Sequence, residues 1–155
     1  MDSSERPIPY MERTRRYYRA LGYQNDYVWA HFADVPFTLL PKPLTDLWIG
    51  LVTTAGPPRG YPRDENGLRH VWSGAIEPPP PRLATDVAWD RETTHVDDRA
   101  SYLPIEAASE LARLTPRFHG VPTEYSQRKT QEEDAPEVLR RLRDDGAEAA
   151  ILVPI

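Results

Sequence analysis

Cysteine is absent from the 155-residue sequence. Its absence excludes disulfides, thiolate metal sites and thiol nucleophiles from the chemistry of these residues. Long apolar runs are also lacking, and none approaches the roughly 18 residues that a membrane-spanning helix requires. The N-terminal stretch MDSSERPIPYMERTRRYY contains no apolar core of the signal-peptide kind. We therefore expect a cytoplasmic protein without a membrane partner.

A basic excess is missing as well, since the formal net charge is -5. This charge argues against a general binder of nucleic acid or of anionic membranes. No GxGxxG or phosphate-binding loop occurs, so the sequence indicates no nucleotide and no other cofactor held by these residues. Hydrophobic residues make up 39% and charged residues 28%, which is typical of a globular chain. After these exclusions, we expect the partner to be a small-molecule substrate.

Proline is abundant, with 17 residues. It imposes extended or turn conformations on much of the backbone and leaves room for few long helices. A helix is predicted over residues 10–21, where it ends at Gly22. The following aromatic, proline-containing stretch predicts an extended arm that packs either on the core or on a partner subunit. We expect residues 1–46 to form this helix and arm, and residues 47–155 to form an α/β domain.

Apolar patterns predict three strands in the second region. Residues 47–54 form an almost continuously apolar run, as a central parallel strand does, and residues 149–153 predict a second buried strand. A shorter strand is expected over 71–76. Helices are predicted over 104–114 and 134–145, the latter with Asp134 as N-cap. Together these elements predict an α/β fold with a mostly parallel open sheet flanked by helices.

Thr53 and Thr54 end the first predicted strand. Open α/β sheets bind ligands just beyond the carboxyl ends of their strands, so both residues are substrate-binding candidates. Threonine is also simply a favourable strand residue, and that interpretation stays open.

Polar side chains concentrate in residues 85–98, TDVAWDRETTHVDD. In a functional interpretation, His95 is a general acid or base oriented by Asp97 or Asp98, and Asp90 is a further catalytic candidate. The alternative is a solvated loop in which an aspartate caps the next helix.

Metal chemistry is a further alternative for the same region. A metal-dependent lyase or hydrolase would use His95, Asp97, Asp98 and His119 as ligands. Their spacing matches no strong metal signature, and we assign no metal ligand.

Residues 119–128, HGVPTEYSQR, predict a structured loop after a short strand that ends at Phe118. His119 is a catalytic candidate here. Donors and acceptors for an anionic or amino-acid-like ligand come from four residues: Arg117, Glu124, Tyr125 and Arg128. The two arginines could clamp a carboxylate in fork geometry. The alternative is that they pair with the acidic run 131–134, and that His119 is a hydrogen-bonded loop residue.

Several stretches together resemble the glycine/sarcosine/betaine/D-proline reductase selenoprotein B family. They are YMERTRRYYRALGY, YVWAHFADVPFT, KPLTDLWIGLVTTAG, AWDRETTHVDD, PRFHGVPTEYSQRKT and DAPEVLRRLRDDGAEAAILVP. The resemblance is to the short bacterial members and spans nearly all of the chain, with residues 57–67 the least alike. It implies an oxidoreductase that uses thiol or selenol chemistry on a small substrate, with a thiol protein as electron donor. A homo-oligomer is also compatible with the sequence.

In that family, a Cys-x-x-Cys-type pair, in some members with selenocysteine first, directly follows the strand that corresponds to residues 149–153. The resemblance therefore implies a redox pair beyond Ile155, with the sequence ending there because a selenocysteine codon was read as termination. The alternatives are a deliberate boundary or a natural short paralogue that acts as a non-catalytic binding module. In the truncated case, we expect these 155 residues to be inactive in redox chemistry.

Overall fold

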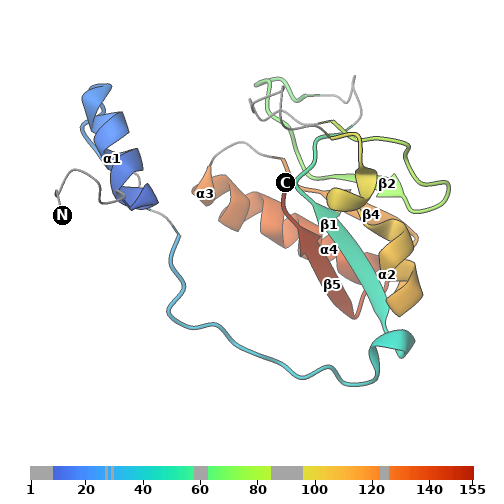
Figure 1. Cartoon of the computed structure of the whole chain (residues 1–155). Coiled ribbons are helices and arrows are strands. Elements are labelled where there is room, and N and C mark those ends of the chain that lie inside the picture. Colours follow the sequence, from blue (N-terminus) through green and yellow to red (C-terminus); the bar gives the residue numbers. More distant parts are fainter. Residues whose placement is uncertain (1–8, 27, 29, 58–62, 85–95, 123–125) are drawn as a thin grey trace, which may run out of the picture. The chain divides into compact units, whose positions relative to one another are not determined.

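The computed structural model describes residues 9–26, 28, 30–57, 63–84, 96–122 and 126–155 (Figure 1). It divides into two compact units, residues 1–37 and 38–155. The sequence suggested a boundary after residue 46 instead. Residues 38–46 belong with the second unit because, for example, Lys42 Nζ lies 2.9 Å from Glu148 Oε2, just before the last strand. No helix in the described part of the chain is both long and apolar enough to cross a membrane.

The first unit contains helix α1, Tyr10–Ala20, which confirms the predicted helix. It stops at Gly22, whose positive φ of 91° is favourable only for glycine. Two residues of its last turn contact the chain that follows the helix: Arg19 pairs with Asp26 at 2.5 Å, and the Tyr18 ring packs edge-on against Tyr23. None of the helical residues is buried within the described structure.

The second unit is built on a five-stranded mixed sheet (Figure 1). Its strands are β1 Trp48–Thr53, β2 Trp72–Ala75, β3 Arg113–Leu114, β4 Arg117–Gly120 and β5 Ala149–Val153. Strand β1 pairs in parallel with β3 at its start, with β4 at its end, and with β5 along its other side. Only β2 is antiparallel, to β4. The predicted α/β fold with a mostly parallel sheet is therefore confirmed.

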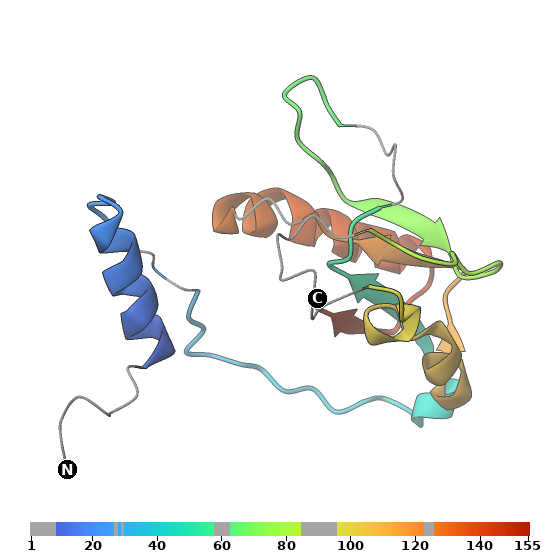
Figure 2. The same cartoon turned by 45° about the horizontal axis from the view of Figure 1, so that its top comes forward.

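Helices cover both faces of this sheet (Figure 2). One is α2, Ile105–Leu111. The other is a continuous helix made of α3 Gln127–Lys129, the π-turn η4 Thr130–Asp134 and α4 Ala135–Asp144. Two short 3-10 turns are η2 Leu44–Asp46 and η3 Arg99–Ser101. Helix α4 lies so close to β1 that a Cβ on Gly50 would sit 2.1 Å from Leu142 Cδ2. On the opposite face, Leu51 and Phe118 pack with Tyr102 in the main apolar core.

Three local expectations were wrong. Strand β5 is not fully buried: among the described strands it pairs only with β1, and Leu152 is 71% exposed. The helix predicted over 104–114 is shorter, since its last residues form β3. Asp134 is not an N-cap. The helix begins earlier, where the Ser126 hydroxyl accepts the Lys129 N–H at 3.2 Å.

Candidate functional site at the carboxyl edge of the sheet

The carboxyl ends of β1 and β5 meet at Thr53 and Thr54. The Thr54 N–H donates to the Val153 carbonyl at 3.3 Å, and Thr54 Oγ1 accepts the Ile155 N–H at 2.8 Å. Thr53 is fully buried, and its hydroxyl accepts the Ala55 N–H at 3.1 Å. The structure thus brings both predicted threonines to the sheet edge where ligands bind in open α/β folds. The Thr53 hydroxyl is therefore occupied by the turn that follows β1, whereas the Thr54 hydroxyl binds the backbone directly after β5.

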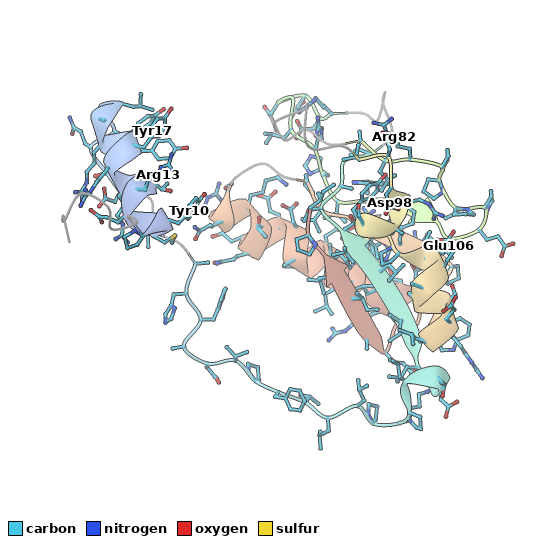
Figure 3. All side chains as sticks on the ribbon, viewed as in Figure 1. Tyr10, Arg13, Tyr17, Arg82, Asp98 and Glu106 are labelled. Carbon is cyan, nitrogen blue, oxygen red and sulfur yellow. The ribbon has the colours of Figure 1, made fainter. Side chains whose placement is uncertain are left out.

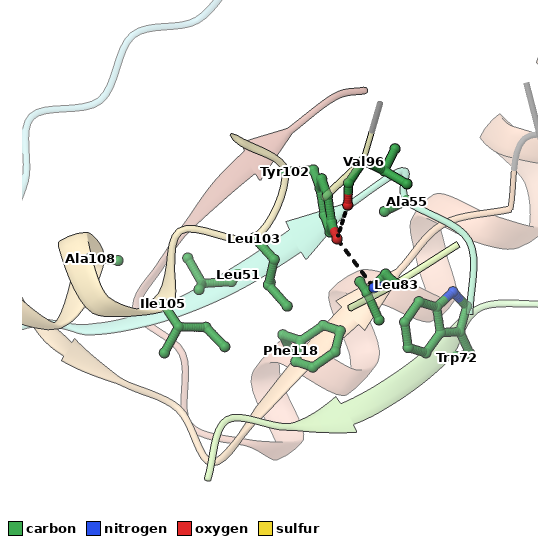
Figure 4. Close-up of a cluster of buried hydrophobic side chains, with 10 residues drawn as sticks. All are labelled: Leu51, Ala55, Trp72, Leu83, Val96, Tyr102, Leu103, Ile105, Ala108 and Phe118. Carbon is green, nitrogen blue, oxygen red and sulfur yellow. Dashed lines mark hydrogen bonds between the residues drawn. The ribbon is translucent and has the colours of Figure 1, made fainter. Parts of the chain in front are cut away.

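The segment that carries Asp90 and His95 starts and ends beside this edge. The backbones of Gly56 and Ala84 exchange two hydrogen bonds, of 2.7 and 3.0 Å, directly after β1. The buried Tyr102 hydroxyl accepts the Leu83 N–H at 3.2 Å and donates to the Val96 carbonyl at 3.1 Å (Figure 4). One side chain therefore ties together the two flanks of residues 85–95.

Four predicted site residues lie outside the described residues: Asp90, His95, Glu124 and Tyr125. Val121, two residues before the undescribed residues 123–125, also reaches the edge, because its N–H donates to the Thr53 carbonyl at 2.9 Å.

His119 does not lie in a loop, as the sequence suggested, but within β4. It is fully buried and faces helix α4, because side chains alternate along a strand and its neighbour Phe118 faces the opposite core. Its Nδ1 lies 2.9 Å from Ser73 Oγ, and its Nε2 lies 3.3 Å from Asp145 Oδ2. A ring buried in this way does not reach a substrate, so the structure does not support a catalytic role for His119.

The hydrogen positions around His119 follow from its neighbours. The Asp145 carboxylate beside Nε2 favours the tautomer with its hydrogen on that nitrogen. His119 Nδ1 then accepts the Ser73 hydroxyl hydrogen, while Ser73 Oγ accepts from Arg141 Nη1 at 3.0 Å. The neutral ring then carries its own hydrogen on Nε2, toward Asp145. Burial lowers the pKa of His119, the Asp145 charge opposes this shift, and the charges of Arg117 and Arg141 strengthen it.

The two arginines of the predicted clamp are held apart by different carboxylates. Arg117 makes a two-pronged contact with Asp145, with Nη2 at 2.6 Å and Nε at 3.1 Å, and this contact raises the pKa of the guanidinium. Arg128 pairs with Glu132 at 2.9 Å on the exposed surface of the helix. The alternative interpretation, pairing with the acidic run, is thus correct for Arg128 and wrong for Arg117.

Of the four residues proposed as metal ligands, His95 lies outside the described residues, and Asp97, Asp98 and His119 form no common site. Asp98 accepts the Ala100 N–H at 2.9 Å and Asp97 pairs with Arg82 at 2.9 Å; Asp98 and the helix α2 residue Glu106 can be followed in Figure 3. His119 points to the other face of the sheet. Within the described ranges, no group of three His, Cys, Asp or Glu side chains is placed to hold a metal ion.

One buried ion pair had no counterpart in the sequence-based predictions. Lys129 Nζ lies 2.7 Å from Asp134 Oδ1, and the two side chains are only 7% and 4% exposed. The pair spans the π-turn η4, whose register brings residues five apart onto the same side of the helix. A Lys and an Asp five residues apart do not match the spacing of three or four that pairs side chains on an α-helix, so the pair could not be predicted from sequence.

An apolar groove of about 220 Å³ runs beside strand β2. Its lining includes Trp72, Phe118, Leu83 and two residues of the proline-rich segment, Pro78 and Pro80. It offers little polar surface that could orient a reacting group. The carboxyl edge at Thr54 is therefore the better candidate for a chemical site.

Comparison of the chain with protein-family models, with curated proteins and with solved structures finds no match.

Proposed function

We propose that these residues form the substrate-side part of a thiol- or selenol-dependent reductase of the selenoprotein B kind. The observation that carries this proposal is the contact between the end of β5 and the end of β1, where Thr54 Oγ1 accepts the Ile155 N–H at 2.8 Å. In the family that the sequence resembles, the redox-active residues directly follow this strand. They would therefore begin at the carboxyl edge, beside Thr54.

The chemistry of such a reductase fits this edge. A thiol or selenol in the first turn of a helix after the strand lies near the positive end of the helix dipole, which lowers its pKa. The reactive anion would displace the substrate's leaving group and form a bond to the remaining fragment. A second cysteine two residues further on would then attack the first sulfur or selenium, which releases the fragment for protonation and leaves the pair oxidised as an internal bond. A thiol protein then restores the reduced pair.

Within this proposal, the described residues position the reacting groups and do not themselves react. Thr54 fixes the backbone from which the redox pair departs. The Gly56–Ala84 contact and the Tyr102 hydroxyl hold the flanks of the segment that carries Asp90 and His95. The buried His119 and the ion-paired Arg117 take no direct part, because neither presents a free group at the edge.

The DNA that follows the Ile155 codon tests the proposal directly. We expect an in-frame UGA or cysteine codon, then two further codons and a cysteine codon. A continuing frame without this pair, or a natural stop that is not UGA, would overturn the proposal.

A protein-level test uses the chain extended by its genomic continuation, with cysteine at the first redox position. We expect the pH profile of iodoacetamide alkylation to give this cysteine a pKa below the usual 8.5 or so. Thr54→Val should slow substrate reduction, because the Ile155 N–H loses its acceptor. Thr115→Val is the matched control, since that buried threonine bonds the Arg117 carbonyl away from the edge. Equal effects of both variants would contradict the role of Thr54.

A non-catalytic binding module is the second candidate, and the absence of any thiol among the 155 residues favours it. In that case, the natural frame ends after Ile155 and the chain is folded and monodisperse as it stands. Size-exclusion chromatography with light scattering distinguishes the two candidates. Aggregation of the 155-residue chain through the exposed side of β5 would count against the module.

A further inference from the structure

The contacts of His119 connect helix α4 to two strands at one point. From β2 comes the Ser73 hydroxyl, and from β4 comes Arg117. Helix α4 and its C-cap contribute the remaining charged groups that face the ring: Glu137, Arg141 and Asp145. On strand β1, the apolar Val52 is paired in register with His119. The apolar contact beneath the helix is small, with four buried residues: Val52, Val71, Val138 and Leu142.

The polar contacts work together only while the ring is neutral. Arg141 donates to Ser73, Ser73 donates to His119 Nδ1, and Nε2–H lies toward Asp145 without the alignment of a hydrogen bond. A proton from solvent would bind Nδ1, because that nitrogen holds the ring's free lone pair. The Ser73 hydroxyl hydrogen would then have to turn away, and two cationic groups would share the single Ser73 oxygen.

We propose that His119 is a pH-sensitive latch that holds the C-terminal half of helix α4 on strands β2 and β4 when neutral, and releases it when protonated. The protonated ring lies between Arg117 and Arg141, and burial removes the water that would solvate its charge. Asp145 is already engaged by Arg117 in a two-pronged contact, which limits its ability to compensate.

The direction of the pH effect follows from linkage. Burial lowers the pKa of His119 in the folded protein relative to the ordinary value of 6.5. The open state therefore binds the proton more tightly than the closed state. The latch is complete above pH 6.5, and its contribution is lost as the pH falls below 6.5. One proton changes the opening equilibrium by at most tenfold per pH unit.

Amide hydrogen exchange between pH 7.5 and 5, corrected for intrinsic rates, tests this latch on the whole chain. We expect the protection of residues 139–145 to fall by up to tenfold per pH unit below 6.5. His119→Asn keeps an acceptor near the Nδ1 position but does not titrate, so this pH dependence should vanish. His70→Asn is the control, because the exposed His70 pairs with Asp64 and should leave helix α4 unchanged.

Titration of the His119 ring by NMR provides a second readout that needs no foldable variant. Its signal is identified by its absence in His119→Asn or, if that variant is unfolded, by its survival in the combined variant H31N/H70N/H95N. A ring pKa below 6.5 that coincides with the loss of helix protection supports the latch. A pKa at or above 6.5, helix protection that does not follow the ring, or unchanged pH dependence in His119→Asn would overturn it.

Discussion

Removing one partner of the Lys129–Asp134 pair is expected to destabilise the α/β unit far more than removing both. The two side chains are joined at 2.7 Å and are each less than a tenth exposed, so solvent screens neither charge well. Lys129→Met leaves the Asp134 carboxylate buried without a counter-ion, and Asp134→Leu does the same to the ammonium group. Breaking such a pair from one side costs about 3–5 kcal/mol.

The double variant K129M/D134L removes both charges and fills similar volume with apolar side chains. Because desolvation of two ions is costly, such a replacement is often neutral or stabilising by about 1–4 kcal/mol. The coupling energy of the double-mutant cycle should therefore be several kcal/mol and favourable. The π-turn sharpens this expectation: in a regular α-helix, residues five apart lie about 140° apart around the axis, so only the π register aligns the pair.

Urea unfolding followed by far-UV circular dichroism measures these energies. With a slope of about 2 kcal/mol/M, each single variant should lower the midpoint by roughly 1.5–2.5 M, while the double variant stays close to the wild type. The exposed neighbouring pair is the matched control, and Glu132→Gln should change stability by less than about 0.5 kcal/mol. Additive losses in the double variant, or single losses as small as the control, would refute the argument.

Three smaller predictions use the same unfolding assay or NMR. Tyr102→Phe leaves the backbone groups of Leu83 and Val96 without their hydroxyl partner and should cost about 1–3 kcal/mol; an unchanged midpoint would contradict this. Gly120→Ala places a Cβ 2.0 Å from the Trp72 ring and should cost about 1–3 kcal/mol, unless that ring moves freely. Hydrogen bonds from two arginines lower the pKa of Glu137 to about 2, so its stabilising contribution persists above pH 4.5 and is lost between there and about pH 2; a carboxyl titration midpoint near 4.5 would disprove it.

The backbone plan of the second unit was largely predictable, because burial leaves its pattern in the residue types. The apolar run of β1 predicted a central strand, and β1 has strands paired on both of its sides. Gly22 likewise predicted the end of helix α1. The same pattern could not separate a central strand from an edge strand. Strand β5 has an equally apolar sequence, yet one of its sides lacks a partner among the described strands.

Glycine and proline were the reason for predicting a loop directly after Phe118, and this prediction was wrong for His119 and Gly120. Gly120 belongs to β4, where it pairs with Thr53 and Trp72. It is glycine because the Trp72 indole occupies the space of a side chain, and not because the backbone turns there. A residue that is small for packing reasons cannot be told from a turn residue until its cross-strand neighbour is known.

Whether a polar pair could be predicted depends on how far apart its two members lie along the chain. Arg128 and Glu132 are four residues apart, and helix geometry alone makes such pairing predictable. Arg117 meets Asp145 across 28 residues, and Ser73 meets His119 across 46. Each member of these two pairs belongs to a different element, so only the sheet order and the position of α4 bring them together. The strand ends therefore predict the sheet edge at Thr54. The proposed roles of His119 and Arg117 in a site did not hold, because their partners Ser73 and Asp145 are distant in sequence and leave no local pattern.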